Sequence, residues 1–223
     1  ESGAEGIERA PRRRGGRVVP AGELFEWEVT ADKGLALRGE LRLCVHIGAG
    51  MRNGSIRAES SVGAGAGARM EGGELEILGD AGKGACRNMQ NGFVRIRGGA
   101  ESGLAENMRR GIVVLEGRAE GTVGEKMHGG TVLLLGGAAA AEQIGRSLSR
   151  GTIVLPNDAE IPGGFARTAS GDYAFLRLLF LELLEKGVPI PNGWVGGAFT
   201  RFRGDAAGLG KGEVFAFAGE TAL

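Results

Sequence analysis

Short apolar runs recur along the middle of the chain. In the first run Ile56 and Ala58 alternate with Ser55 and Arg57, and the next two runs alternate in the same way. Alternation with a period of two predicts strands that bury one face and expose the other. The six runs are residues 55–58, 74–77, 93–96, 112–115, 131–134 and 152–155.

A fixed period of 19 residues connects the first five runs. The five methionines stand at this spacing, and a glycine follows each of them after three positions. They are Met51, Met70, Met89, Met108 and Met127, followed by Gly54, Gly73, Gly92, Gly111 and Gly130. Leu148 and Gly151 take these positions before the sixth run, after a slip of two residues. One glycine-bounded strand per short unit is typical of a solenoid.

The length of the unit selects the kind of solenoid. Nineteen residues with several glycines leave no room for two helices, so the helical repeat classes are excluded. Stacked strands about 4.8 Å apart would form a parallel β-helix. We expect the methionines to form an interior column and the glycines to supply positive φ at the corners.

Charges at outward positions fit the stacked arrangement. Arg57, Glu76 and Arg95 would form one outer column of alternating sign, and Arg97 would lie beside Glu116 in another. Each such pair is worth about 0.2–1 kcal/mol and disfavours a slip of register.

The later coils lose the alternation. Val114, Leu133 and Val154 stand where the early coils carry charges, and strands that are apolar on both faces are buried on both faces. An apolar helix is predicted from Asp172 to Lys186, capped by Ser170–Asp172 and ended by Gly187 and Pro189. Because a large exposed apolar patch is rare, we expect this helix to pack across the three residues and to turn its remaining apolar side to a partner subunit.

The chain therefore divides into three predicted parts. Residues 1–20, with Arg12, Arg13 and Arg14, are expected to form a flexible basic tail. Residues 21–165 are expected to form the β-helix, and residues 166–223 the C-terminal helix and a closing segment. The predicted fold class is all-β, a parallel β-helix with one helix packed on its side.

Composition excludes several classes of function. Lysine plus arginine equals aspartate plus glutamate at 27 each, which argues against nucleic-acid binding. The 44 glycines lack a collagen period, and 42% apolar residues exclude plain disorder. Two cysteines fit a reducing cytoplasm, and the chain has no stretch of about 20 apolar residues that predicts a membrane span.

Glycine-rich motifs give no nucleotide site. The segment from Gly208 to Glu213 lacks the full phosphate-loop spacing and its terminal Ser or Thr. The segment from Gly63 to Gly67 lacks the surrounding strand, loop and helix of a dinucleotide site, so both are interpreted as repeat corners.

Side chains with catalytic chemistry are few. Cys44 and His46 stand two apart, where they would share a face of a strand, whereas Cys86 and His128 fall in different coils. Neither pair has the further ligands that a metal needs, and no Ser/His/Asp arrangement is found. No catalytic residue and no metal ligand is predicted in this chain.

The arginines outnumber the lysines, 22 to 5, and guanidinium groups bind carboxylates in bidentate pairs. Arg109 and Arg110 are candidates for binding a carboxylate-rich molecule.

The repeat unit carries a resemblance to a known family. The unit from Met89 through Gly92 and Gly98 to Ala100 resembles the GXGXG domain, a right-handed β-helix found in glutamate synthase and in the C subunit of formylmethanofuran dehydrogenase. The similarity covers about residues 39 to 155. The apolar helix after the coils, Gly204-Asp205 and the segment from Gly210 to Glu213 resemble the C subunit. A composition rich in arginine and alanine favours the related bacterial formyltransferase/hydrolase complex.

The resemblance implies a function for the whole complex. In that family the complex moves formyl groups between tetrahydromethanopterin and a methanofuran-type cofactor in the one-carbon metabolism of methylotrophs, and the bacterial form releases formate. The metal and the catalytic residues belong to hydrolase and formyltransferase subunits, which are the expected partners. This chain would be a non-catalytic C subunit without a cofactor of its own. The alternatives are a structural β-helix of an amidotransferase such as glutamate synthase, and the C subunit of a tungsten or molybdenum formylmethanofuran dehydrogenase.

Overall fold

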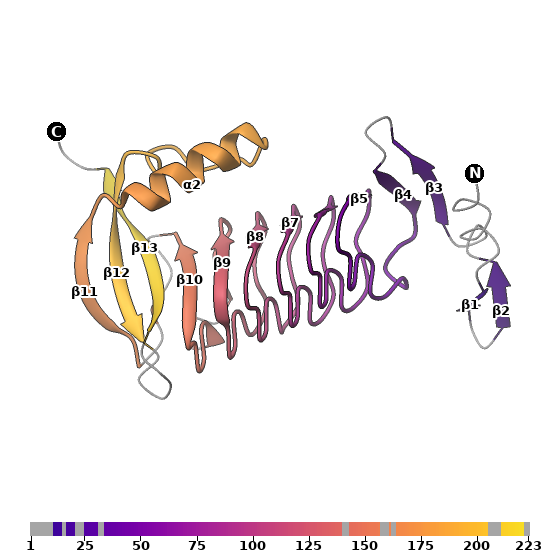
Figure 1. Ribbon diagram of the computed structural model, residues 1–223, viewed down its shortest axis with the longest axis horizontal. Helices are drawn as coiled ribbons and strands as arrows, with labels where there is room; N and C mark the ends of the chain where they lie inside the picture. Colours follow the sequence, from indigo (N-terminus) through magenta and orange to yellow (C-terminus); the bar gives the residue numbers. More distant parts are fainter. Residues whose placement is uncertain are drawn as a thin grey trace.

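The computed structural model describes residues 11–14, 17–20, 25–30, 34–139, 143–156, 161, 164–204 and 211–220. Six stacked strands form its centre (Figure 1). These are β5 (Ser55–Ala58), β6 (Glu74–Ile77), β7 (Phe93–Ile96), β8 (Ile112–Leu115), β9 (His128–Leu134) and β10 (Arg150–Leu155). The first four coincide with the predicted runs, and the last two contain the predicted runs and begin a few residues earlier.

Each central strand pairs in parallel with its copy in the next coil. Ile56 of β5 lies opposite Leu75 of β6, which lies opposite Val94 of β7. Pairing of this kind continues through β8 and β9 to β10. The predicted parallel β-helix with one helix packed on it is confirmed.

The interior of the solenoid is a continuous apolar core. Met70, Met89, Met108 and Met127 are each 0% exposed. Met51 is partly buried and packs against the same core from the first coil. The methionine column therefore runs along the interior, and its first member lies at the open end.

Glycines at the start of each strand allow the coils to approach. Gly111 has φ +93°, and a Cβ placed there would lie 2.5 Å from the Gly92 carbonyl oxygen and 2.9 Å from the Met89 methyl carbon. The methionine of one coil thus fills the space left by the glycine of the next, and a side chain at Gly111 would meet both backbone and side chain.

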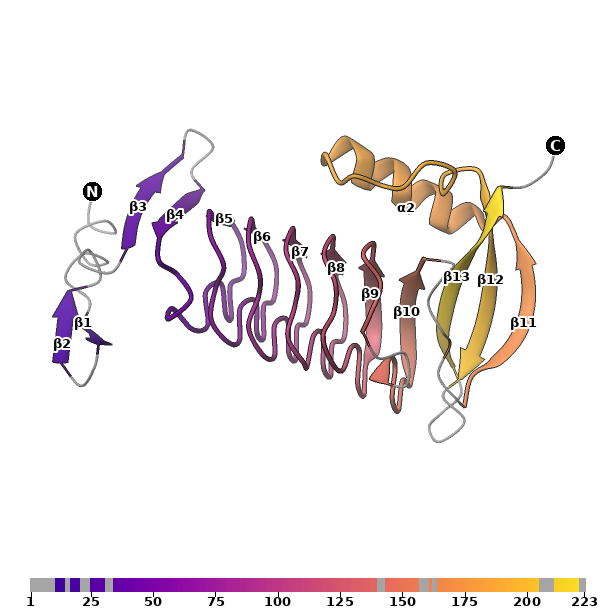
Figure 2. The ribbon, with the colours of Figure 1, turned by 180° about the vertical axis from the view of Figure 1, so that it is seen from behind.

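Additional strands extend the central sheet at both ends. At the C-terminal end, β13 (Gly212–Glu220) pairs in parallel with β10, and β12 (Gly197–Gly204) and β11 (Ala166–Gly171) follow in antiparallel order. At the other end, β4 (Leu35–Gly39) pairs in parallel with β5, and β3 (Phe25–Val29) lies antiparallel beside it. The result is an eleven-stranded sheet, seen from both sides in Figures 1 and 2.

These end strands differ from the expected segments. The sequence predicts a helix and a closing segment after residue 165, without the three strands that form there. In the segment expected as a tail, β1 (Pro11–Arg14) and β2 (Arg17–Pro20) form an antiparallel ribbon. The rest of that segment, residues 1–10, 15 and 16, lies outside the described residues.

The helix α2 (Ala174–Glu185) is shorter than predicted and begins without the predicted cap. Its N-cap is Tyr173, and no side chain caps the helix. Ser170 and Gly171 belong to β11, whereas Asp172 forms an ion pair with Arg177. The expectation that Ser170–Asp172 caps the helix is therefore wrong, because the sheet takes up the first two of these residues. Within the described residues, no helix combines the length and apolarity needed to span a membrane.

Candidate functional site

The outer face of the later coils is a second apolar core beneath α2. Val114, Leu133 and Val154, from β8, β9 and β10, are each 0% exposed. Their buried partners come from the helix, the loop after it and two end strands (Figure 2). These partners are Leu176, Phe180, Leu183, Val188, Ile190, Trp194, Phe199 and Phe215. The helix thus covers the coils where the sequence loses its polar outward positions.

Sequence reasoning missed the aromatic part of this cluster. Trp194 packs against Phe180 and Phe199 with ring centroids 5.4 Å apart in each case. Phe199 and Phe215 lie on β12 and β13, strands outside the 19-residue repeat. The continuous apolar run from Val214 to Ala218 was the signal available for one of these strands.

Arg95 joins the third coil to the end of the helix. Its Nε donates to Glu116 Oε1 at 2.5 Å, and its Nη2 donates to the carbonyl oxygen of Gly187 at 2.9 Å. Carbonyls at a helix C-terminus carry partial negative charge, which a guanidinium stabilises. Arg95 is only 8% exposed, so the outward position predicted for it is in fact covered by the end of α2.

The ion pairs of the outward charged residues differ in one detail from the prediction. Arg57 Nη1 lies 2.7 Å from Glu76 Oε2, as the outer column requires. Arg97, however, binds Glu76 at 2.7 Å rather than Glu116, because Glu116 is taken by Arg95. Arg97 and Glu116 follow the opposed residues Ile96 and Leu115 and so lie in neighbouring positions as predicted, but the ion pair expected between them is replaced by the one with Glu76.

Replacing Arg95 by methionine should lower the free energy of unfolding by about 1.5–3 kcal/mol, because hydrogen bonds from a charged donor to Glu116 and Gly187 are lost in a buried place. Arg97→Met is the matched control, since its ion pair is exposed and should contribute about 1 kcal/mol or less. Urea unfolding of the two variants measures the difference. Equal losses would contradict the role of Arg95 at the helix end.

A groove of ≈ 430 Å³ lies on the uncovered part of the same sheet face. Arg57, Glu76, Phe93 and Lys186 are among its lining residues. In Figure 1 this part of the sheet lies between the end of α2 and the β3–β4 hairpin. Lys186 Nζ lies 2.6 Å from Glu74 Oε1 and 5.1 Å from the centre of the Phe93 ring. Because its charged groups pair with one another and Leu35, Ile56 and Phe93 also line it, the groove presents a mixed polar and apolar surface with little net charge.

Arg109 and Arg110 lie on an exposed corner before β8. Neither forms a salt bridge with another described residue. The exposed residues His128 and Arg150 lie opposite each other in the next two coils. The structure thus places the two arginines on a corner to which neighbouring coils add further basic groups.

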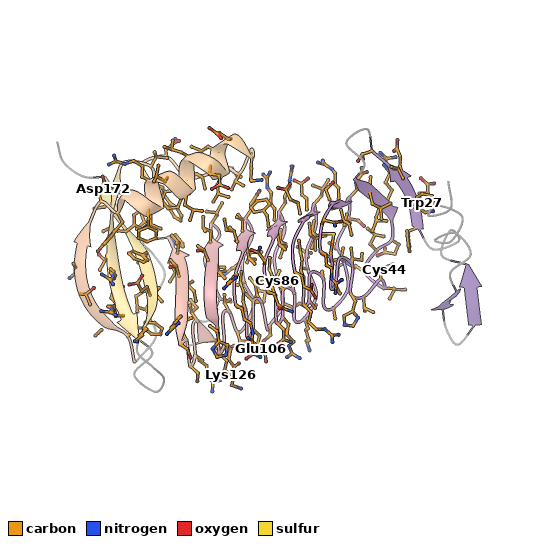
Figure 3. All side chains as sticks on the ribbon, viewed as in Figure 1. Trp27, Cys44, Cys86, Glu106, Lys126 and Asp172 are labelled. Atoms are coloured by element: carbon orange, nitrogen blue, oxygen red, sulfur yellow. The ribbon has the colours of Figure 1, made fainter. Side chains whose placement is uncertain are left out.

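The cysteines and histidines do not come together. Cys44 and His46 lie in the turns after β4 rather than on a strand, so the expected shared strand face is wrong. Cys86 is buried inside the solenoid and His128 is exposed. Figure 3 shows Cys44 and Cys86 in different coils. Among the described residues, no group of three or more His, Cys, Asp or Glu side chains could hold a metal ion.

The structure describes the two glycine-rich motifs to different extents. Residues 64–69 form turns of the second coil. In the other motif, residues 208–210 lie outside the described residues. Gly212 and Glu213 begin β13, so the interpretation of this part as a repeat corner is wrong.

Burial raises the pKa of the Cys86 thiol from an ordinary value near 9 to about 12. The native thiol should therefore stay neutral and resist iodoacetamide at pH 9, whereas the partly exposed Cys44 should react. The Cys86 thiol ionises at a lower pH in the unfolded chain than in the native chain. Its contribution to the free energy of unfolding is therefore present below about pH 9 and is lost as the pH rises toward 12. Mass spectrometry of labelled peptides checks this prediction, and equal native labelling of both cysteines would contradict it.

No protein-family model matches the chain, and no curated protein matches it. One of the solved structures that match the chain is a multi-subunit complex. The crystal structure of the formyltransferase/hydrolase complex (FhcABCD) from Methylorubrum extorquens, in complex with methylofuran, contains a chain with 26% sequence identity and a TM-score of 0.77. The match covers 97% of this chain and 89% of that chain. The resemblance to this complex, predicted from the repeat, the segments after it and the composition, is confirmed.

Proposed function

We propose that this chain is a non-catalytic structural subunit, equivalent to the C subunit, of a formyltransferase/hydrolase complex. The observation that carries the proposal is the match to a chain of such a complex, which extends over 97% of this chain. A match of this extent includes the solenoid, the end strands and α2, and not the repeat alone.

The proposed complex transfers formyl groups between tetrahydromethanopterin and a methanofuran-type cofactor and releases formate. The methylofuran bound in the similar complex supports the furan cofactor. Hydrolase and formyltransferase subunits would carry the metal and the catalytic residues. The proposed location is the cytoplasm, and two cysteines that are not joined by a disulfide suit a reducing compartment.

A structural role agrees with how this chain uses its reactive groups. Cys86, the more buried thiol, has a pKa of about 12 and is not a nucleophile at neutral pH. Glu76 and Glu116 are held by arginines of neighbouring coils. These groups stabilise the stack of coils, which makes the solenoid a rigid support for other subunits.

The exposed corner with Arg109 and Arg110 is the part of this chain that we propose to contact cofactor. Two consecutive, exposed arginines without salt-bridge partners among the described residues fit a carboxylate-rich chain, such as a polyglutamate tail. The contact would raise the affinity of the complex for its cofactor without a part in the chemistry.

Reconstitution tests the proposed function. The purified chain alone should show no formyl transfer and no formate release, and adding it to the cognate hydrolase and formyltransferase subunits should give an active assembly. Turnover by the isolated chain that persists after repeated purification and metal removal would overturn the non-catalytic role. In the assembly, Arg109→Glu with Arg110→Glu should raise the KM for the cofactor at low salt, and an unchanged KM would exclude the arginine contact.

A further inference from the structure

A row of exposed apolar side chains winds around α2 on the part of the helix that is not buried against the solenoid. Four large apolar side chains there are exposed to solvent: Phe175 by 47%, Leu178 by 68%, Leu181 by 44% and Leu184 by 43%. We call these four residues the outer row. Single exposed leucines are ordinary, but four along one short helix form the kind of patch that marks an interaction site.

Apart from Phe175, which also packs against Phe215, the outer row is not needed to attach the helix to the solenoid. That attachment uses Leu176, Phe180 and Leu183, which are at most 1% exposed. Their spacing of four and three places them on one side of the helix. The outer row repeats every three residues and forms a ridge of the type that fits into a groove of a packing partner.

The outer row is held on a rigid base. At one end, the Phe175 ring packs edge-on against Phe215 with the centroids 5.4 Å apart. At the other end, Arg95 holds the Gly187 carbonyl and Lys186 binds Glu74. A surface that is ordered before binding loses little conformational entropy when a partner docks.

Charge around the outer row indicates the kind of partner. The two basic residues of the helix and its end are already neutralised, since Arg177 pairs with Asp172 and Lys186 with Glu74. Glu182 and Glu185 are exposed and form no salt bridge with a described residue. The rim is therefore acidic, and a second copy of this helix would bring the same uncompensated charges against it.

We propose that the outer row is the docking surface for a different subunit of the complex, which receives it in an apolar groove with a basic rim. The inference rests on the proposed function for the existence of such a subunit. It adds which surface of this chain binds and the chemistry of the surface that receives it.

Binding of two variants to the cognate hydrolase and formyltransferase subunits tests the proposal. The variant Leu178→Glu with Leu181→Glu should bind at least about 30-fold more weakly than the wild-type chain, as expected when central apolar contacts of an interface are lost. Glu182→Lys with Glu185→Lys should also weaken binding, and the loss should shrink at high salt because it comes from the charged rim.

Leu43→Glu is the matched control, because Leu43 is 77% exposed and lies in the first coil, at the opposite end of the solenoid from β11 to β13. It should bind as the wild type does, and all variants should keep the wild-type melting temperature.

If the wild-type chain binds but both α2 variants bind equally well, the docking surface is wrong and the proposed function stands. If the wild-type chain binds none of the subunits, the proposed function and the inference both fall. A wild-type homodimer that is lost in the leucine variant would show that a second copy occupies the surface, and would also overturn the proposal.

Discussion

Replacing Gly111 by alanine is expected to lower the free energy of unfolding by roughly 3–5 kcal/mol, because backbone strain and overpacking combine at this position. Its φ of +93° disfavours any side chain. A Cβ would in addition lie 2.5 Å from the Gly92 carbonyl oxygen, which is fixed by the stacked coil and cannot move aside. Few single changes should remove as large a part of the total stability.

Gly54 is the matched control for this prediction. It occupies the same position in the first coil and has a φ of +80°, but nothing lies within 4 Å of a Cβ placed there. Gly54→Ala should therefore cost about 1 kcal/mol, from backbone strain alone. Urea unfolding compares the two variants. If both lose the same stability, the coils are not in the close contact that the stack of glycines and methionines requires.

The second large effect concerns the methionine column. Met89→Ala should lower the free energy of unfolding by about 2–5 kcal/mol, because it removes a fully buried side chain and leaves a cavity between coils. Met51 is partly buried at the open end of the column, so Met51→Ala should cost about 1 kcal/mol.

Thermal and urea unfolding of the two methionine variants measure this difference. The double variant Met89→Ala with Gly111→Ala adds a further check, since these two sites share one space. The combined loss should be smaller than the sum of the single losses, because the methyl group that meets the new Cβ is gone. A melting temperature unchanged by Met89→Ala would mean that the column faces solvent.

The sequence predicts the centre of this fold well because the centre repeats. Each coil pairs with the next in the same register. The boundaries of β5 to β8 therefore follow from the positions of Ile56, Leu75, Val94 and Val113, without any knowledge of distant contacts. The apolar outward positions of the later coils likewise predict that something covers them. Patterns with a period of two or of 19 are local, and local patterns can be read from one sequence.

The ends could not be predicted in the same way. The strands β11, β12 and β13 occur once, and their pairing joins segments such as Ala166 and Arg203 that are far apart in the chain. The burial of Arg95 depends on the helix end 92 residues later. The missing helix cap has the same cause, because the tertiary pairing of β11 takes Ser170 away from the helix.

The candidate sites could likewise be predicted only where a local sequence pattern marks them. The outward residues Val114, Leu133 and Val154 are marked by the pattern of their strands, and the structure places them together beneath α2. The groove beside Lys186 and Phe93 was not predicted, because it forms where the helix end meets strands from a distant part of the chain. The outer row of α2 is visible in the sequence only as an excess of leucines, and its acidic rim required the ion pairs of Arg177 and Lys186 to be known.

The mass of the assembly formed on co-expression tests the central claim most directly. Native mass spectrometry of this chain expressed with its cognate hydrolase and formyltransferase subunits should detect one stable hetero-oligomer that contains all the chains and sustains formyl transfer. If the other subunits assemble and turn over without this chain, and the chain remains alone in the same sample, the account of it as a structural subunit of the complex is wrong.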